Sequence, residues 1–138
     1  MSDAPDAFVY NCKLERVIDG DGFVLTEIDL GFKVKLANQS VRMAGIDTPE
    51  SRINIKRQPE RIPEKKLGLQ AKERLKELLT GNIKIKSLGR GKYGRLFAIP
   101  YDEDGNDICA KLIEEGLAAP YWGGKKKAKI KNDGTWGE

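Results

Sequence analysis

The sequence of 138 residues contains no histidine and only two cysteines, and these shortages exclude several kinds of active site. A Ser-His-Asp triad, an imidazole general base and a zinc site with histidine ligands all need histidine. Two cysteines cannot form a four-thiolate zinc site, and we expect both to be small buried thiols. A bound metal ion would therefore need oxygen ligands, which favours hard cations such as calcium, magnesium or manganese.

Long apolar runs are also missing, because no stretch approaches the roughly 18 residues that a membrane span needs. The chain begins with MSDAPD, which is acidic where a secretory signal is basic and then apolar. We therefore expect no signal peptide, no membrane partner, and a chain that is cytoplasmic or already processed. The 25 Lys and Arg exceed the 21 Asp and Glu, and this net charge of +4 is compatible with a nucleic-acid partner.

Alternating apolar and polar residues predict five short strands. They occupy about residues 8–17, 23–29 and 33–44, and two more begin at Ile83 and Leu96. A 3.6-residue apolar period predicts an amphipathic helix from Gly68 to Gly81, and a shorter helix is expected over 108–115. The predicted fold is mainly β (α+β), a five-stranded OB-fold barrel with two to three flanking helices.

Two segments are rich in basic residues. Residues 51–66 lack periodicity, contain Pro59 and Pro63, and carry three Arg and three Lys against two Glu, so a mobile basic loop is expected. Five lysines stand between positions 125 and 131. We predict a flexible N-terminus at 1–7, a folded domain at 8–122 and a basic, flexible tail at 123–138. The lysines at 125–131 either contact a nucleic-acid backbone or are simply solvated, whereas the 51–66 loop directly follows Glu50 and is better placed to contact a substrate strand.

Three motifs carry side chains suited to phosphate chemistry. They are Ile-Asp-Gly-Asp at 18–21, Val-Arg-Met-Ala-Gly-Ile-Asp-Thr-Pro-Glu at 41–50 and Lys-Tyr-Gly-Arg at 92–95. Taken singly they are ordinary, since Asp-Gly-Asp is a common turn and Asp-Thr-Pro-Glu can begin a helix. Together they offer carboxylates for a divalent ion and guanidinium groups that form paired hydrogen bonds with phosphate oxygens.

With Glu-Gly-Leu-Ala at 115–118, these motifs resemble those of the staphylococcal nuclease (thermonuclease-like) family over about residues 8–122. The resemblance implies an OB-fold barrel and a calcium-dependent phosphodiesterase, a nuclease that cleaves DNA and RNA with little base specificity. The expected products have 3′-phosphate and 5′-hydroxyl ends, and a monomer is expected. The residues that the resemblance assigns are Asp21, Asp47 and Thr48 as Ca²⁺ ligands, Arg42, Glu50 and Arg95 as catalytic groups, and Lys92, Tyr93 and Tyr121 as substrate-binding groups.

These assignments agree with what the hydrolysis of an anionic diester requires. In the family pattern Thr48 offers its backbone carbonyl to the metal ion, Glu50 acts on the attacking water, and the two arginines bind the scissile phosphate. Positioned proton transfer supplies about 3–5 kcal/mol and one preorganised donor about 3–4 kcal/mol, so no single residue is sufficient. Loss of Glu50, Arg42 or Arg95 is therefore expected to be severe.

One residue departs from the family pattern, and another competes with Tyr121 for the role of stacking on a base. Gly22 stands where a hydroxyl residue is common after Asp-Gly-Asp. This glycine either loosens the metal-binding loop or leaves calcium coordination more dependent on water, so it bears on the metal affinity. Trp122 follows Tyr121 directly and is a rival for stacking on a base, although either ring could instead cover the rim of the barrel. The alternative to an enzyme is a non-cleaving OB module that binds nucleic acid or a protein partner, and a purely structural subunit is a third reading.

Overall fold

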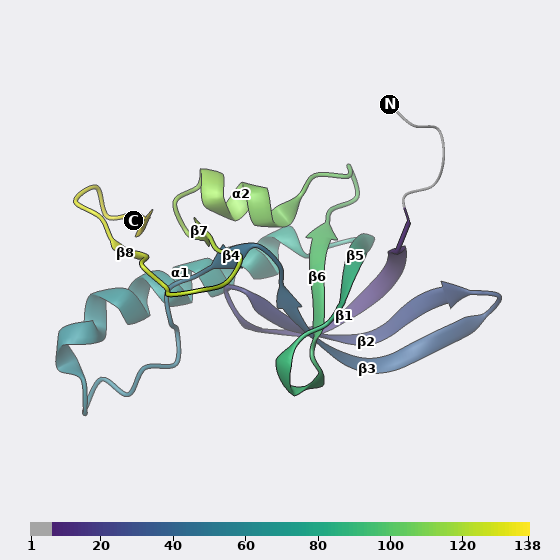
Figure 1. The fold of residues 1–138 in the computed structure, drawn as a ribbon, viewed down its shortest axis with the longest axis horizontal. Coiled ribbons are helices and arrows are strands. Elements are labelled where there is room, and N and C mark those ends of the chain that lie inside the picture. Colours follow the sequence, from purple (N-terminus) through teal and green to yellow (C-terminus); the bar gives the residue numbers. More distant parts are fainter. Residues whose placement is uncertain (1–6) are drawn as a thin grey trace.

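In a computed structural model that describes residues 7–138, five strands close into a barrel in the order β1-β2-β3-β6-β5. The strands are β1 (Val9–Asp19), β2 (Gly22–Gly31), β3 (Val34–Met43), β5 (Ile83–Arg90) and β6 (Leu96–Tyr101). Neighbouring strands are antiparallel except β3 and β6, which run parallel where Val41 lies opposite Leu96. Figure 1 shows the helices beside the barrel and the β2–β3 hairpin extending away from them. The predicted OB-fold barrel is confirmed.

The long helix, α1 (Ile62–Leu78), begins earlier than the sequence pattern predicts. It follows a short 3-10 helix, η1 (Pro59–Arg61), so residues 59–66 are helical and the expectation of a loop there is wrong. The reason is that proline fits the first turn of a helix, where its missing N–H would have no partner. Pro59 and Pro63 therefore stand at the starts of two helices rather than interrupting one. The second helix, α2 (Ile108–Glu114), is confirmed.

The C-terminal part of the chain is packed against α1. Two short antiparallel pairs complete the fold, β4 (Ile46–Asp47) with β7 (Ala119–Pro120) and β8 (Lys129–Ile130) with β9 (Trp136–Gly137). Trp136 is buried with Leu67 of α1 and Ala119. Residues 123–138, expected to form a flexible tail, thus contain a hairpin held by a buried tryptophan. The expected flexible N-terminus lies, except for Ala7, outside the described residues.

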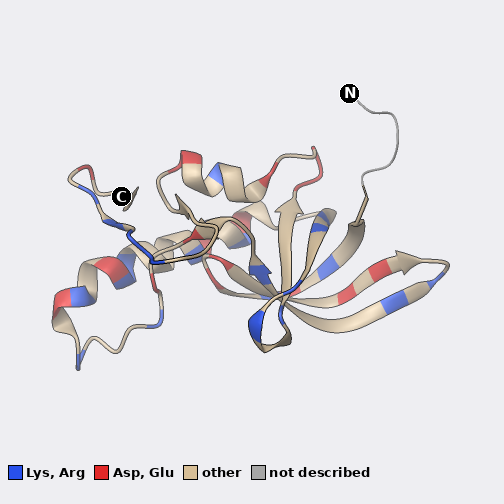
Figure 2. Cartoon of the chain, in the orientation of Figure 1, with Lys and Arg blue, Asp and Glu red and all other residues tan. Residues whose placement is uncertain are grey.

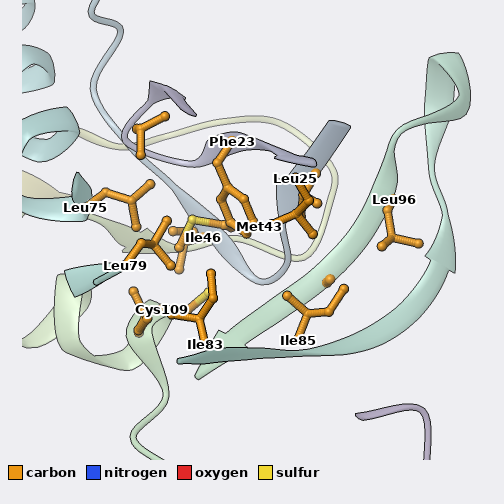
Figure 3. Packing of buried hydrophobic residues seen from close by; sticks show 14 of the residues in the cluster. Phe23, Leu25, Met43, Ile46, Leu75, Leu79, Ile83, Ile85, Leu96 and Cys109 are labelled. Carbon is orange, nitrogen blue, oxygen red and sulfur yellow. The ribbon is translucent and has the colours of Figure 1, made fainter. Parts of the chain in front are cut away.

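The core lies inside the barrel and beneath both helices. Figure 3 shows strand residues such as Phe23, Leu25 and Ile85 facing Leu75 and Leu79, the last just after α1 ends. Such alternate inward-facing positions are the period-2 pattern of half-buried strands. Cys12 and Cys109 are free thiols, and burial raises the pKa of each to about 12. Cys109 is buried as expected, whereas Cys12 is only half-buried. No helix among residues 7–138 is long and apolar enough to cross a membrane.

Candidate functional site

A pocket of about 450 Å³ brings together side chains from three separate parts of the chain. Arg42 comes from the end of β3, Lys92 and Arg95 come from the turn before β6, and Tyr121 follows β7. The turn before β6 includes a short 3-10 helix, η2 (Lys92–Gly94). Four of the nine predicted site residues therefore line one pocket. Its remaining lining residues are Gly45, Ile46, Gly91, Phe97, Trp122, Gly123 and Gly124.

Arg42 connects this pocket to the acidic turn between β1 and β2. Its guanidinium donates hydrogen bonds from Nη1 to the Met43 carbonyl at 2.6 Å and from Nη2 to the Ile46 carbonyl at 2.9 Å. The same Nη2 atom lies 3.4 Å from Oδ2 of Asp21. Because the β2–β3 register places Arg42 opposite Gly22, the arginine is set directly beside the turn that carries Asp21. The guanidinium is thus fixed by two carbonyls and one carboxylate.

The acidic turn contains a second carboxylate, Asp19, which the site prediction did not include. Asp19 accepts a hydrogen bond from the Asp21 N–H at 3.3 Å, and its Oδ2 lies 3.3 Å from Nη2 of Arg52. Burial raises the pKa of Asp19, and with the side-chain hydrogen bond and the negative charge of Asp21, which also raise it, the pKa reaches about 7. The Asp21 backbone N–H and the charge of Arg52 oppose this rise. Two carboxylates this close favour a cation nearby.

The acidic turn lies against the segment that carries the other predicted metal ligands. A Cβ atom at Gly20 would lie 2.8 Å from the Ala71 Cβ and 3.0 Å from the Thr48 Oγ1, so only glycine permits this close approach. Thr48 is buried and directly follows Asp47 in the chain. The structure therefore brings the turn of Asp21 next to the segment of Asp47 and Thr48.

The donor set of these segments suits a hard cation chemically. Within residues 7–138 no group of three or more His, Cys, Asp or Glu side chains forms a ready metal cluster. Two carboxylates and the Thr48 carbonyl would thus need water molecules to complete the coordination shell of a metal ion. Calcium tolerates such a shell because it takes roughly 6–8 oxygen ligands, which include carboxylates, carbonyls and water. In the structure Oδ1 of Asp47 is paired with Nζ of Lys126 at 3.3 Å, a contact that the sequence does not signal.

Five predicted residues do not line the pocket: Asp21, Asp47 and Thr48 lie in the acidic turn and the segment beside it, whereas Glu50 and Tyr93 face solvent. The Glu50 side chain is exposed, and its backbone N–H donates a hydrogen bond to Oε2 of Glu64 at 3.1 Å. Tyr93 is 94% exposed and has a left-handed backbone conformation, with φ of 61°. Both residues stand directly beside segments that line or border the site, so their backbones are near it while their side chains point into solvent.

Aromatic side chains form one wall of the pocket. Trp122 and Phe97 meet edge to face, with ring centroids 6.3 Å apart and an interplanar angle of 83°. The Tyr121 hydroxyl donates a hydrogen bond to the Gly124 carbonyl at 2.7 Å, which fixes the turn that follows. Tyr121 and its rival Trp122 both line the pocket, so the structure gives both rings access to a ligand. Phe97 could not be predicted as a pocket residue because it lies outside the motifs and is typical of any strand.

Comparison with known proteins agrees with this geometry. The profile of the family described as "Staphylococcal nuclease homologue" matches residues 40–135. Endonuclease YhcR of Bacillus subtilis (strain 168) is 26% identical over 117 residues, which cover 82% of this chain and 9% of that protein. The chain therefore spans a small fraction of the length of this relative. Because the profile covers well over half of the chain, the protein belongs to the staphylococcal nuclease homologue family.

Proposed function

We propose that this chain is a calcium-dependent nuclease that hydrolyses phosphodiester bonds of DNA and RNA with little base specificity. The products would carry 3′-phosphate and 5′-hydroxyl ends. The observation that carries the proposal is the pocket shared by Arg42, Lys92 and Arg95, which is joined through Arg42 to the carboxylate of Asp21. The name of the relative, an endonuclease, supports the same reaction class.

The two arginines are suited to different parts of phosphate binding. Arg42 is already held by two carbonyls and Asp21, so its guanidinium is preorganised and costs little entropy to use. The Arg95 side chain is exposed and makes no hydrogen bond or ion pair within residues 7–138, so all its donors are available to a ligand. Guanidinium groups stabilise the charge that develops on the phosphate oxygens during hydrolysis.

Asp21, Asp47 and the Thr48 carbonyl would hold the calcium ion. A bound divalent ion acts as a Lewis acid on phosphate and lowers the pKa of a bound water. The contact between Gly20 and Thr48 supports this assignment, since it places the two ligand segments against each other. The Asp21 turn is also anchored to the barrel through the β2–β3 register, and the Asp47 segment is held by its pairing with Ala119 of β7.

Glu50 would accept the proton of the attacking water. Its backbone is fixed by the hydrogen bond to Glu64, and Glu64 is itself held by two hydrogen bonds from Arg61 at 3.3 and 3.0 Å. The Glu50 carboxylate stays in solvent, where it can receive a proton. Lys92, Tyr93 and Tyr121 would contact the nucleotide, and base stacking on an aromatic ring is tolerant of sequence.

The experiment is a cleavage assay on labelled single-stranded DNA, duplex DNA and RNA, with calcium, with magnesium and with chelator. We expect cleavage of all three substrates with calcium and none with chelator. Products should accept phosphate from a polynucleotide kinase directly, because their 5′ ends are free hydroxyls. Intact substrates under every condition would overturn the proposal.

A second function, a non-cleaving OB module, is favoured by one specific contact. Lys126 places an ammonium group on Asp47, so one of the proposed metal ligands already has a cationic partner. The other proposed ligand carboxylate, Asp21, has a cationic partner too, since Arg42 lies 3.4 Å from it. A module of this kind would bind nucleic acid equally well in calcium and in chelator and would cleave it in neither. The same assay therefore separates the two functions when binding is recorded alongside cleavage.

A further inference from the structure

The positive charge of the chain is concentrated in two segments. Residues 51–66 and 125–131 together hold eleven Lys and Arg but only two Glu, a net charge of +9. Since the whole chain carries +4, the remaining residues carry a net charge of −5. The protein is therefore an acidic body with one strongly basic region, and its overall charge understates this asymmetry.

The fold places these two segments side by side although they are far apart in the sequence. A surface hollow of about 420 Å³ is lined by Glu60, Arg61, Pro63 and Glu64 from one segment and by Ala128, Lys129 and Ile130 from the other, with Trp136 beside them. Ala128 and Ile130 pack against the buried cluster of Leu67 and Trp136. Figure 2 shows the basic residues of the C-terminal segment running past α1.

Most of the basic side chains in this region lack acidic partners. Lys125, Lys127 and Lys129 are exposed and form no ion pair with any residue in 7–138, and the same is true of Lys56, Arg57 and Lys66. Elsewhere on α1, by contrast, Lys76 pairs with Glu73 at 3.0 Å and Arg74 pairs with Glu77 and Glu115. Unpaired like charges repel one another, and a polyanion would relieve this repulsion.

The basic region is continuous with the pocket. Gly123 and Gly124 line the pocket and lead directly to Lys125, and Lys126 contacts Asp47. The segment then passes into β8, which is fixed by its pairing with β9 and by the hydrogen bond from the Trp136 N–H to the Gly116 carbonyl at 2.7 Å. Ala128 and Ile130 are half-buried, while Lys127 and Lys129 between and beside them are exposed. The exposed side chains of the segment are thus all lysines, with no exposed apolar side chain that could enter a lipid surface, and this suits a phosphate backbone.

We propose that residues 125–131, together with the exposed basic side chains of 51–66, form a track for the sugar-phosphate backbone of a nucleic-acid strand whose reacting phosphate lies in the pocket. This track rests on the proposed function for the pocket itself. It makes the preferred substrate a strand longer than the pocket, because the additional binding energy comes from phosphates on one side of the cleaved bond. A dinucleotide would fill the pocket and leave the track unused.

The test is binding of the full chain to labelled single-stranded DNA in chelator, where no hydrolysis is expected. One probe is a strand of about 24 nucleotides, longer than the roughly 4–16 that one OB fold covers, and the other is a dinucleotide. The variant is Lys125→Gln/Lys127→Gln/Lys129→Gln, which spares Lys126. The matched control is Lys33→Gln/Lys84→Gln/Lys86→Gln, which removes the same charge at positions outside the basic region and without ion pairs in 7–138.

For the long strand, we expect the first variant to bind at least about tenfold more weakly. The slope of log affinity against log salt should become shallower by about 2, since each lost single-strand phosphate contact contributes about 0.7. Dinucleotide binding should be unchanged, and the control should keep the parental slope. If both variants lose the same affinity for the long strand, the loss reflects net charge rather than a track. If the first variant loses no affinity, its three lysines are merely solvated. Either result overturns the track.

Failure of the track and failure of the nuclease proposal give different results. If the track is wrong but the pocket cleaves, the first variant cleaves long strands and dinucleotides with parental kinetics in calcium. If the track is right but the protein does not cleave, the salt slope still falls in the first variant while every substrate stays intact. Binding in chelator therefore tests the track independently of turnover.

Discussion

Nζ of Lys126 lies 3.3 Å from Oδ1 of Asp47 and 5.6 Å from the centroid of the Tyr121 ring. The Asp47 side chain is 8% exposed and the Lys126 side chain is 60% exposed, so a flexible cation reaches a nearly buried carboxylate from the surface. If Asp47 is a calcium ligand, this ammonium group competes with the metal ion for the same oxygen. When the ammonium group is paired with Asp47, this carboxylate binds a calcium ion less strongly.

Replacing Lys126 by glutamine should therefore tighten calcium binding. A half-exposed ion pair is worth up to about 1 kcal/mol, which corresponds to a roughly fivefold lower dissociation constant. Calorimetric titration of calcium measures it, with Lys127→Gln as the control because Lys127 is exposed and has no ion-pair partner in 7–138. Weaker binding in Lys126→Gln would mean that the lysine assists the metal site instead.

Arg95→Ala should lower the turnover number by at least about two decades, equivalent to about 3 kcal/mol of transition-state stabilisation. The melting temperature should stay within error of the parent, because the Arg95 side chain is exposed and has no hydrogen-bonding partner in residues 7–138. Single-turnover cleavage and thermal denaturation measure the two effects. Lys84→Ala, exposed on β5, is the control for lost positive charge. Turnover within tenfold of the parent would remove Arg95 from the reaction.

Arg42→Ala should impair both stability and activity. Its guanidinium satisfies the carbonyls of Met43 and Ile46 and pairs with Asp21, so truncation leaves three polar groups without their partner. We expect a loss of about 1–3 kcal/mol in the free energy of unfolding, measured by urea denaturation. Arg42→Lys keeps the charge but cannot reproduce the fork of donors, and should recover only part of the loss. An unchanged unfolding free energy in Arg42→Ala would contradict the structural role.

The barrel strands and three of the side chains that line the pocket could be predicted from local sequence signals. Strand alternation predicted the barrel strands. The motifs contain Arg42, Lys92 and Arg95, which the structure brings to one pocket because each stands at the end of a strand or in a tight turn, whereas Tyr121 was assigned by the family resemblance alone. In such positions the backbone fixes the side chain's location, so a short motif carries most of the information.

Contacts between distant segments had no local signal. The burial of Trp136 against Leu67 depends on the path of the whole C-terminal segment. The lysines that precede Trp136 in the sequence are instead typical of a solvated tail. The ion pair between Lys126 and Asp47 depends on the same path. The start of α1 was misplaced because prolines act as helix breakers or helix starters according to position.

The ion pair between Arg74 and Glu115 predicts a defined pH dependence of stability. Arg74 Nε and Nη2 donate to the two Glu115 oxygens at 2.7 and 2.9 Å, and this pairing, aided by Lys111, lowers the pKa of Glu115. The unfolded chain therefore binds more protons in acid than the native chain does. The stabilisation is complete above the unfolded pKa of about 4.3 and is lost as the pH falls through the lower native pKa.

Glu115→Gln should thus be less stable than the parent by about 1 kcal/mol at pH 7, and the difference should shrink toward zero as the pH falls through the lowered native pKa of Glu115. Urea denaturation at several pH values measures it. Glu114→Gln, one residue earlier and exposed, is the matched control. A difference that stayed constant across this pH range would show that the pair contributes through packing rather than through charge.

The last prediction concerns Gly45, which holds Trp122 in the wall of the pocket. Gly45 has a φ of +78°, and a Cβ atom there would overlap the Trp122 ring, approaching its Cε2 atom to 2.8 Å. Gly45→Ala should therefore cost about 1 kcal/mol for the left-handed backbone and more for the displaced ring. Gly31→Ala is the control for backbone strain alone, since Gly31 has a φ of +88° and nothing within 4 Å of the added carbon.

A double-mutant cycle with Trp122→Ala separates the two costs. In the Trp122→Ala background, Gly45→Ala should cost no more than Gly31→Ala does, because the clash has been removed and only backbone strain remains. The coupling free energy should exceed about 0.5 kcal/mol, the usual limit of additivity for independent sites. Urea denaturation of the four proteins gives this value. Equal costs of Gly45→Ala in both backgrounds would mean that the indole moves freely to accept the added carbon. Gly45 would then not determine the position of Trp122 in the pocket wall.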